Sequence, residues 1–319
     1  MDPLSHVLFG RTLALTVDRA SSRGIPAALV IGSILPDADA ILAPVRFDLY
    51  LNAHVSGTHS LFGTVVEALA LTLVLRRVIR GSRAVTLFIA SCVGLLGHVF
   101  WDLVDGSDIE VLRPFRDSTF GWHLVSMAEP VVLSCLLGAV LLAWWWPRRA
   151  RAIAVAMLAA LSVFLLSKMQ SQHLARKQYV ASLGAEAPPS FAVTPQFGRL
   201  FSWNVYARSA RDVQAWTVDS WTGRVESVFV YQDASAQPGV EWSRRLPVVH
   251  TFLGLAMIPF ARVADESGQR FVFWSDATSC SADGCDVSFG AAVDDRMAPL
   301  FQVIQIGSFQ QRRALSGVR

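Results

Sequence analysis

The feature that most constrains this chain is a set of long apolar runs confined to its first half. A membrane span needs roughly 20 apolar residues, and three runs reach that length: residues 61–79, 84–104 and 124–146. Residues 152–167 form a slightly shorter run, and residues 7–17 and 25–35 are shorter still. These runs predict a helical bundle of four membrane spans, preceded by a short N-terminal helical hairpin.

The composition changes along the chain, which indicates separate domains. We predict a membrane-embedded helical domain over residues 1–168, a proline-containing linker over residues 169–198, and a β-rich α+β soluble domain over residues 199–319. Residues 246–258 read as a short helix or a buried strand. Alternating apolar patterns predict an antiparallel sheet with one covering helix, its strands at residues 201–207, 213–218, 225–231, 270–274 and 300–306.

Arginine placement predicts the orientation in the membrane, because short loops rich in arginine stay in the cytoplasm. One such loop carries Arg76, Arg77, Arg80 and Arg83, and another carries Arg148, Arg149 and Arg151. The C-terminal domain is then expected outside the cytoplasm. The net charge is +3 and the arginines lie scattered in short loops, so the sequence does not favour nucleic-acid binding.

Histidines and carboxylates gather at the ends of the apolar runs, where ionisable groups are costly and suggest function. Five of the seven histidines lie in this half of the chain. Threading the chain through the arginine-rich turns brings one set of ionisable residues to the outer face: His6, Asp37, Asp39, His59, Asp102, His123 and Glu129. This convergence predicts one shared site.

His98 and Asp102 are spaced i, i+4, so both point to one side of a helix. That spacing suits two ligands of one metal, and a hydrogen bond along the helix face is the alternative. Asp37 and Asp39 follow Pro36, which interrupts the local helix. Either aspartate can ligate or orient a neighbour, and solvated aspartates in a turn are the alternative.

His54 and His59 lie five residues apart, a spacing that does not fit one helix face. We expect His54 in a loop and His59 at the start of the next helix, near Thr58 and Ser60 as capping candidates. Glu129 lies just inside an apolar run, where an unpaired carboxylate is costly. The predicted metal ligands are His6, Asp37, His59, His98, Asp102 and Glu129. Asp39, His54 and Glu129 are the candidates for general acid/base work.

Several imidazoles with carboxylates favour Zn²⁺ or Mn²⁺, with Fe also compatible, over Ca²⁺ or Mg²⁺ alone. More ligands are present than one tetrahedral ion needs, so the sequence allows one or two divalent ions. Two neighbouring ions suit the activation of water for attack on an ester. A closed structural metal site would use the same residue types.

In number and order, these clusters resemble the bacterial membrane-bound metal-dependent hydrolases of the YdjM-like family, described as LexA-binding inner-membrane hydrolases. The resemblance covers residues 1–135. It rests on Met1 to His6 with Gly10, Leu35 to Asp39, His54 with Gly57 to Ser60, Gly97-His98 with Asp102, Arg113 to Phe115, and Glu129-Pro130. The chain departs from the family pattern at Ser5, Ala38, Val55-Ser56 and Glu129, and its turn after Asp102 is shorter.

The resemblance implies a multi-pass protein of the bacterial inner membrane that hydrolyses an ester or phosphoester. A site beside the bilayer favours a lipid or lipid-linked substrate. The alternative is a non-enzymatic interaction or sensor protein with a structural metal site; the protein partner is unknown in either case. A transporter would want an internal repeat, which the sequence does not display. In the last domain, Cys280 and Cys285 enclose a turn sequence, and a disulfide there suits an extracytoplasmic location.

Overall fold

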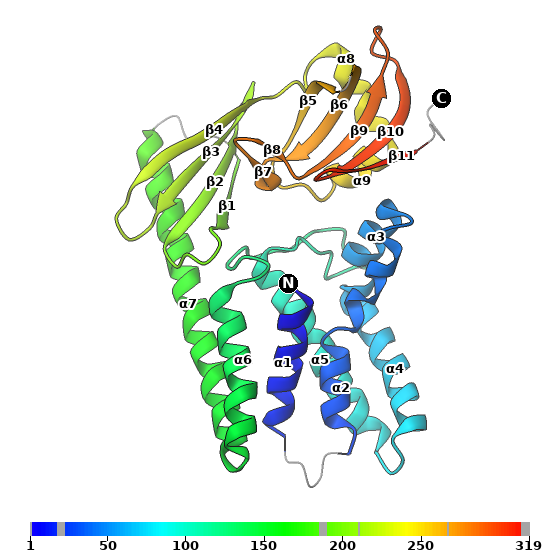
Figure 1. Ribbon diagram of the computed structural model, residues 1–319, viewed down its shortest axis with the longest axis vertical. Helices are drawn as coiled ribbons and strands as arrows, with labels where there is room; N and C mark the ends of the chain where they lie inside the picture. Colours follow the sequence, from blue (N-terminus) through cyan, green and yellow to red (C-terminus); the bar gives the residue numbers. More distant parts are fainter. Residues whose placement is uncertain (1, 18–22, 185–189, 210, 267, 314–319) are drawn as a thin grey trace. The chain divides into compact units, whose positions relative to one another are not determined.

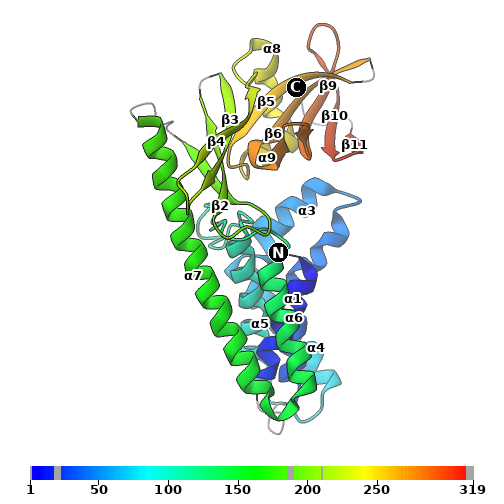
Figure 2. The same cartoon turned by 60° about the vertical axis from the view of Figure 1, so that its left-hand side comes forward.

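The computed structural model describes residues 2–17, 23–184, 190–209, 211–266 and 268–313 (Figures 1 and 2). The chain forms two compact units. The helical unit comprises Met1–Gln170 and Pro195–Leu200, and the sheet unit comprises Ser171–Thr194 and Phe201–Arg319. The predicted fold class, a helical membrane region followed by a β-rich domain with antiparallel sheets, is confirmed.

The helices follow the predicted runs closely. They are α1 (Pro3–Leu15), α2 (Ile25–Gly32), α3 (Phe47–Ala53), α4 (Leu61–Val78), α5 (Ala84–Asp105), α6 (Pro130–Trp145) and α7 (Ala150–Leu183), with the short 3₁₀ helices η1 (Leu35–Leu42) and η3 (Pro147–Arg149) and the π-helix η2 (His54–Thr58). Polar caps start two of them: the Asp2 side chain accepts from Ser5 N, and the Ser60 side chain accepts from Gly63 N. These caps satisfy backbone donors that the first helical turn leaves unpaired.

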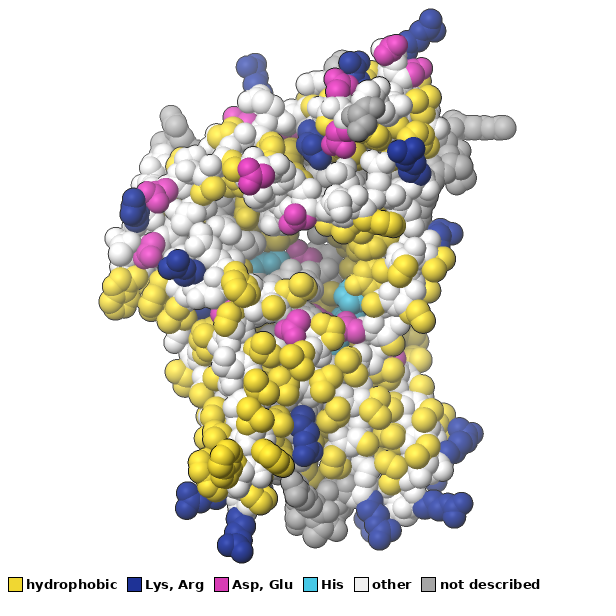
Figure 3. Space-filling model, in the orientation of Figure 1, with side chains coloured by type: hydrophobic (Ala, Val, Ile, Leu, Met, Phe, Trp, Pro, Cys, Tyr) yellow, Lys and Arg dark blue, Asp and Glu magenta, His cyan; other side chains and the backbone are white. Residues whose placement is uncertain are grey.

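Within the described residues, two helices are long and apolar enough to cross a membrane: Ala84–Asp105 and Pro147–Leu183. The number rises to four if each of two bent pairs, α2 with η1 and Leu49–Thr58 with α4, forms one span. Helix α6 is shorter than predicted because it begins at Pro130; upstream of it, Leu124 N donates to Val104 O instead. Apolar side chains cover the visible flank of the helical unit, and Lys and Arg gather at the end where α4 joins α5 and α6 joins α7 (Figure 3).

Glycines let three helices approach closely in the helical unit. A Cβ at Gly94 of α5 would lie 2.6 Å from the Leu29 carbonyl oxygen of α2. A Cβ at Gly97 would lie 2.6 Å from the Phe9 ring of α1, and one at Gly10 would lie 2.8 Å from the same Leu29 oxygen. The small residues thus allow close helix packing. This packing brings α1, α2 and α5 together near the residues predicted to bind metal.

The sheet unit holds two larger antiparallel sheets, where the sequence had predicted one. The first has the order β1-β2-β3-β4, with strands Phe191–Pro195, Ser202–Arg208, Asp212–Asp219 and Val225–Gln232. The second has the order β11-β10-β9-β6-β5, with strands Phe309–Arg313, Pro299–Ile306, Val287–Val293, Gln269–Asp276 and Pro259–Glu266. A small ribbon pairs β7 (Cys280–Ser281) with β8 (Gly284–Cys285), and a disulfide joins Cys280 to Cys285.

Short helices and the end of α7 cover these sheets. Helix α9 (Pro247–Leu253) lies within residues 246–258, the region expected to be a short helix or a buried strand, and α8 (Pro238–Glu241) precedes it. Phe252 of α9 stacks on Phe289 of β9 at 4.5 Å, and the turn η6 (Ala277–Ser279) follows β6. The stretch predicted as a linker holds the end of α7 and strand β1. Tyr179 of α7 packs in one core cluster with Trp203 and Val218 of the first sheet.

Candidate metal centre

Five of the six predicted metal ligands come from four short regions of the helical unit and lie close together. His6 lies on α1, Asp37 on η1, His59 just before α4, and His98 and Asp102 on α5. Three groups of described side chains could each hold a metal ion. Within each group, the candidate ligand atoms lie within 4.8 Å of one another. The groups are His6-His98-Asp102, Asp37-His59-His98 and Asp39-His54-His59.

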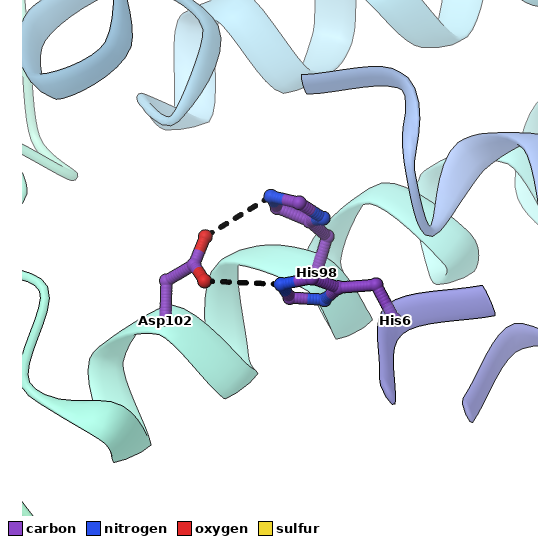
Figure 4. A group of neighbouring side chains, drawn as sticks. All are labelled: His6, His98 and Asp102. Carbon is purple, nitrogen blue, oxygen red and sulfur yellow. Dashed lines mark hydrogen bonds and ion pairs between the residues drawn. The ribbon is translucent and has the colours of Figure 1, made fainter. Parts of the chain in front are cut away.

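Asp102 is the carboxylate on which the histidines converge. Its Oδ2 lies 3.0 Å from His98 Nε2 and 3.1 Å from His59 Nε2, and its Oδ1 lies 3.2 Å from His6 Nε2. Figure 4 shows His98 and His6 reaching the two oxygens of Asp102 from neighbouring helices. The i, i+4 spacing of His98 and Asp102 thus places both on one side of α5, as predicted.

A backbone contact fixes the protonation of the His98 ring. His98 Nδ1 lies 2.8 Å from the Ser33 carbonyl oxygen, and a carbonyl can only accept a hydrogen bond. In the neutral ring Nδ1 therefore carries the hydrogen and Nε2 presents a lone pair. The Ser33 carbonyl is available for this contact because α2 ends at Gly32, and the last carbonyls of a helix lack intrahelical partners.

A side-chain contact sets the tautomer of the His59 ring in the same way. The Thr58 hydroxyl donates to Asp39 Oδ2 at 2.7 Å, and so it accepts from His59 Nδ1 at 2.9 Å. His59 Nε2 then also presents a lone pair, 3.0 Å from His98 Nε2. Two lone pairs and a carboxylate at this distance need a positive species between them. Ligand bonds near 2.0–2.1 Å in tetrahedral geometry separate ligand atoms by about 3.3 Å, so a metal ion fits this spacing.

Asp37 contributes a fourth donor atom, a carboxylate oxygen, on the more open side. Its Oδ1 lies 3.4 Å from His98 Nε2 and 3.8 Å from His59 Nε2. The Asp37 side chain is 20% exposed, whereas those of both histidines are fully buried. The centre is therefore enclosed on the histidine side and accessible beside Asp37.

The group of Asp39, His54 and His59 depends on an unusual turn. His54–Thr58 is a π-helix, the wide i→i+5 turn often found at functional sites. It brings the His54 and His59 rings to 3.8 Å between centroids, and His54 Nδ1 lies 3.2 Å from Asp39 Oδ1. His54 lies in this π-helix and not in the predicted loop, and the i→i+5 geometry accommodates the spacing of five that does not fit one face of an α-helix. His59 joins this group to the first.

His6 lies at the inner edge of the centre. Its ring stacks on that of His98 at 3.8 Å between centroids, and the side chain is fully buried. His6 Nδ1 has no hydrogen-bond partner among the described residues. Its Nε2 can either donate to Asp102 or serve as a further ligand.

Glu129 and His123, both predicted to reach the outer face, lie outside the three groups. Glu129 precedes α6, its Oε2 accepts from the Ser126 hydroxyl at 3.0 Å, and it interacts electrostatically with buried Lys168. His123 Nε2 lies 3.4 Å from Asp108 Oδ1. Polar neighbours other than the centre thus account for the burial of both side chains.

Two contributors to the centre were not predicted as such from the sequence. Thr58 was considered only as a cap, yet Ser60 is the cap of α4 and Thr58 bridges Asp39 and His59. The position of Thr58 between a candidate ligand and a glycine was the available signal. The Ser33 carbonyl carries no sequence signal, because every residue type supplies the same group.

The family described as YdjM inner membrane protein matches residues 1–173, more than half of the 319 residues. The chain belongs to this family. The region common to the YdjM family contains every residue of the three groups, whereas most of the sheet unit lies beyond it. Family membership places the protein in the inner membrane.

A curated relative from Bacillus subtilis (strain 168), named "Uncharacterized protein YfhP", is 22% identical over 148 residues. This alignment covers 44% of the chain and 45% of YfhP, so the chain spans less than half the length of that relative. No solved structure matches the chain. The possible metal centre and the inner-membrane location are therefore the functional features that these findings support.

Proposed function

We propose that this YdjM family member is an integral membrane metal-dependent hydrolase that acts on an ester or phosphoester of a lipid or lipid-linked substrate. The observation that carries the proposal is the meeting of His59 Nε2, His98 Nε2 and Asp102 Oδ2 within about 3 Å of one another. Hydrogen bonds from both imidazoles to Thr58 and to the Ser33 carbonyl leave the lone pairs directed at this point.

Five residues would hold one or two divalent ions, with Zn²⁺ or Mn²⁺ as the best fit to the mixed nitrogen and oxygen donors: His6, Asp37, His59, His98 and Asp102. When bound, such ions lower the pKa of a coordinated water and polarise a carbonyl or phosphoryl group. Asp39 and His54, paired at 3.2 Å, would hold or move a proton beside His59. Glu129 is left out because its neighbours are Ser126 and Lys168.

The proposed substrate class follows from location. The centre lies in a unit whose helices carry the candidate membrane spans, so molecules of the bilayer are the nearest substrates. The arginine-rich turns favour a cytoplasmic location for the opposite end of this unit. We therefore infer that the centre and the sheet unit face the extracytoplasmic side.

The test combines metal analysis with an assay of ester and phosphoester lipids in detergent. We expect the purified protein to contain a transition metal and to lose both metal and hydrolysis in His98→Ala. His250→Ala, which changes an exposed histidine of the sheet unit, is the matched control and should retain both. Equal metal content in the two variants would contradict the assignment of the centre.

A second candidate function is a membrane sensor or interaction protein with a structural metal. The complete burial of His6, His59 and His98 favours it, because structural sites are usually closed. Metal removal distinguishes the two functions. A structural site predicts that the helical unit unfolds on chelation and that restored metal supports no ester hydrolysis.

A further inference from the structure

A groove in the helical unit lies beside the candidate metal centre and is lined by residues that are not among the candidate ligands. It has a volume of about 420 Å³ and lies between the π-turn, the first turns of α4 and the loop at Arg113 and Pro114. Thr58 lines this groove and also contacts His59 and Asp39. The groove therefore borders the candidate metal centre through one shared side chain.

One wall of the groove is apolar and belongs to the surface of α4. Phe62 and Val66 line it and are 57% and 49% exposed. Val65, Leu69 and Leu73 are also about half exposed on the same helix, which is part of a candidate membrane span. Apolar side chains exposed on such a helix face lipid, so an acyl chain can lie along Phe62 and Val66 while it remains next to the bilayer.

The other wall is polar, and its charge selects the kind of head group. Glu67 lines the groove, and its Oε2 is buried with no hydrogen-bond partner among the described residues. A buried carboxylate oxygen without a partner is costly, so this carboxyl group has hydrogen-bonding capacity left to accept from a ligand hydroxyl. Arg113 already pairs with Asp117 at 2.5 Å and with Glu110 at 3.5 Å. Its positive charge is therefore compensated, which favours a hydroxyl-bearing head group over a free anion at this wall.

We propose that this groove binds a membrane amphiphile with a hydroxyl-bearing head group. The acyl chain lies against Phe62 and Val66, and a hydroxyl donates to Glu67. A head group in this position extends past Thr58 toward the metal centre. That last step rests on the proposed function, but binding in the groove does not.

Photo-crosslinking tests the groove without any requirement for turnover. The probe is a monoacylglycerol with a diazirine in its acyl chain, added to the full-length protein in proteoliposomes. The readout is labelling of the tryptic peptide of residues 47–76, bounded by Arg46 and Arg76, that excess untagged monoacylglycerol displaces. Saturable labelling is expected, whereas labelling that no competitor reduces would reflect bulk lipid and would overturn the proposal.

Two neighbouring valines provide matched variants. Val66→Trp fills the groove and should lower the saturable labelling about tenfold, equivalent to the loss of about two buried CH₂ contacts. Val65 has nearly the same exposure, 47%, but does not line the groove. Val65→Trp should therefore label like the unchanged protein, and equal losses in both variants would contradict the groove as the site.

Recognition of the hydroxyl is tested at Glu67. Glu67→Met removes the acceptor and should weaken saturable labelling about tenfold, the effect of losing one hydrogen bond. Glu67→Gln keeps an acceptor oxygen and should restore most of the saturable labelling.

A probe made from the methyl ester of the same fatty acid lacks hydroxyls and should label weakly. Equal labelling by both probes would refute hydroxyl recognition. Saturable labelling without lipid hydrolysis would reject the proposed function and leave this inference standing.

Discussion

The two units of the chain bury polar side chains of different kinds. The helical unit buries His6, His59, His98, Asp102 and Glu129 almost completely. Among the described residues of the sheet unit, the fully buried polar residues are serines and one glutamine, and the buried carboxylate of Asp233 is paired with Arg208. Burial of a titratable group is costly unless it is paired or bound to a metal. The helical unit therefore carries features that a stable fold alone does not require.

The sheet unit satisfies its polar groups locally. Ser275 pairs with Ser288 at 2.8 Å, and the Trp274 indole donates to Ser243 at 2.8 Å. Asp233 accepts from Arg208 at 2.6 Å and from the backbone of Ala261 at 3.1 Å. Each contact stabilises a neighbouring strand or turn. The possible metal centre thus lies in the helical unit, whereas the described polar groups of the sheet unit pair with near neighbours.

The strongest test of this comparison changes one carboxylate in each unit. Asp102→Asn removes the charge on which His6, His59 and His98 converge, and we expect metal affinity to fall about a hundredfold or more. Asp233→Asn should destabilise the sheet unit but leave metal affinity unchanged. Metal titration of both purified variants measures the difference. A comparable loss of affinity in Asp233→Asn would break the separation of roles between the units.

A smaller effect is expected at Thr58, which links Asp39 to His59 without a place among the ligands. Thr58→Val keeps the shape but removes the hydroxyl, so metal affinity should fall about 10- to 100-fold. Thr58→Ser keeps the hydroxyl and should retain most of the affinity. Nitrogen NMR of the histidine rings provides a second readout, because only Thr58→Val should change the tautomer of His59. Identical affinity in the two variants would show that the hydroxyl does not orient His59.

Sequence reasoning predicted the helical unit well because its signals are one-dimensional. The length of the apolar runs indicated the spans, and the i, i+4 spacing placed His98 and Asp102 on one side of α5. The position of Pro36 indicated the end of a helix before Asp37. Each of these signals depends on neighbours in the chain, which the sequence displays directly.

The parts that were not predicted depend on backbone geometry or on distant contacts. The π-turn over His54–Thr58 changes which residues face one another, and residue spacing alone does not reveal it. Glu129 resembled a ligand because it lies beside an apolar run, yet Lys168, far along the chain, lies near it. The division of the strands into two sheets likewise depends on pairings between distant segments, such as β6 with β9.

The close approach of α2 and α5 can be tested by a single methyl group. A Cβ at Gly94 would lie 2.6 Å from the Leu29 carbonyl oxygen, so Gly94→Ala should destabilise the helical unit by about 1–3 kcal/mol. Gly138→Ala on α6 is the matched control, because its Cβ would meet only Met157 at 4.0 Å. Thermal unfolding of both variants in detergent measures the effect. Equal unfolding midpoints in the two variants would mean that α2 and α5 separate easily. The close approach of these helices would then not explain how the candidate ligands come together.

The smallest expected effect concerns the disulfide of the sheet unit. Cys280 and Cys285 are separated by 5 residues, and a loop this short contributes at most about 2 kcal/mol to stability. The double variant Cys280→Ser/Cys285→Ser should therefore unfold at a slightly lower temperature, monitored by near-ultraviolet circular dichroism of the full chain. Its metal content should equal that of Cys92→Ser, which changes a free cysteine on α5. If removal of the disulfide lowered the metal content while Cys92→Ser did not, the sheet unit would have to support the metal centre directly, and the proposed separation of roles would fail.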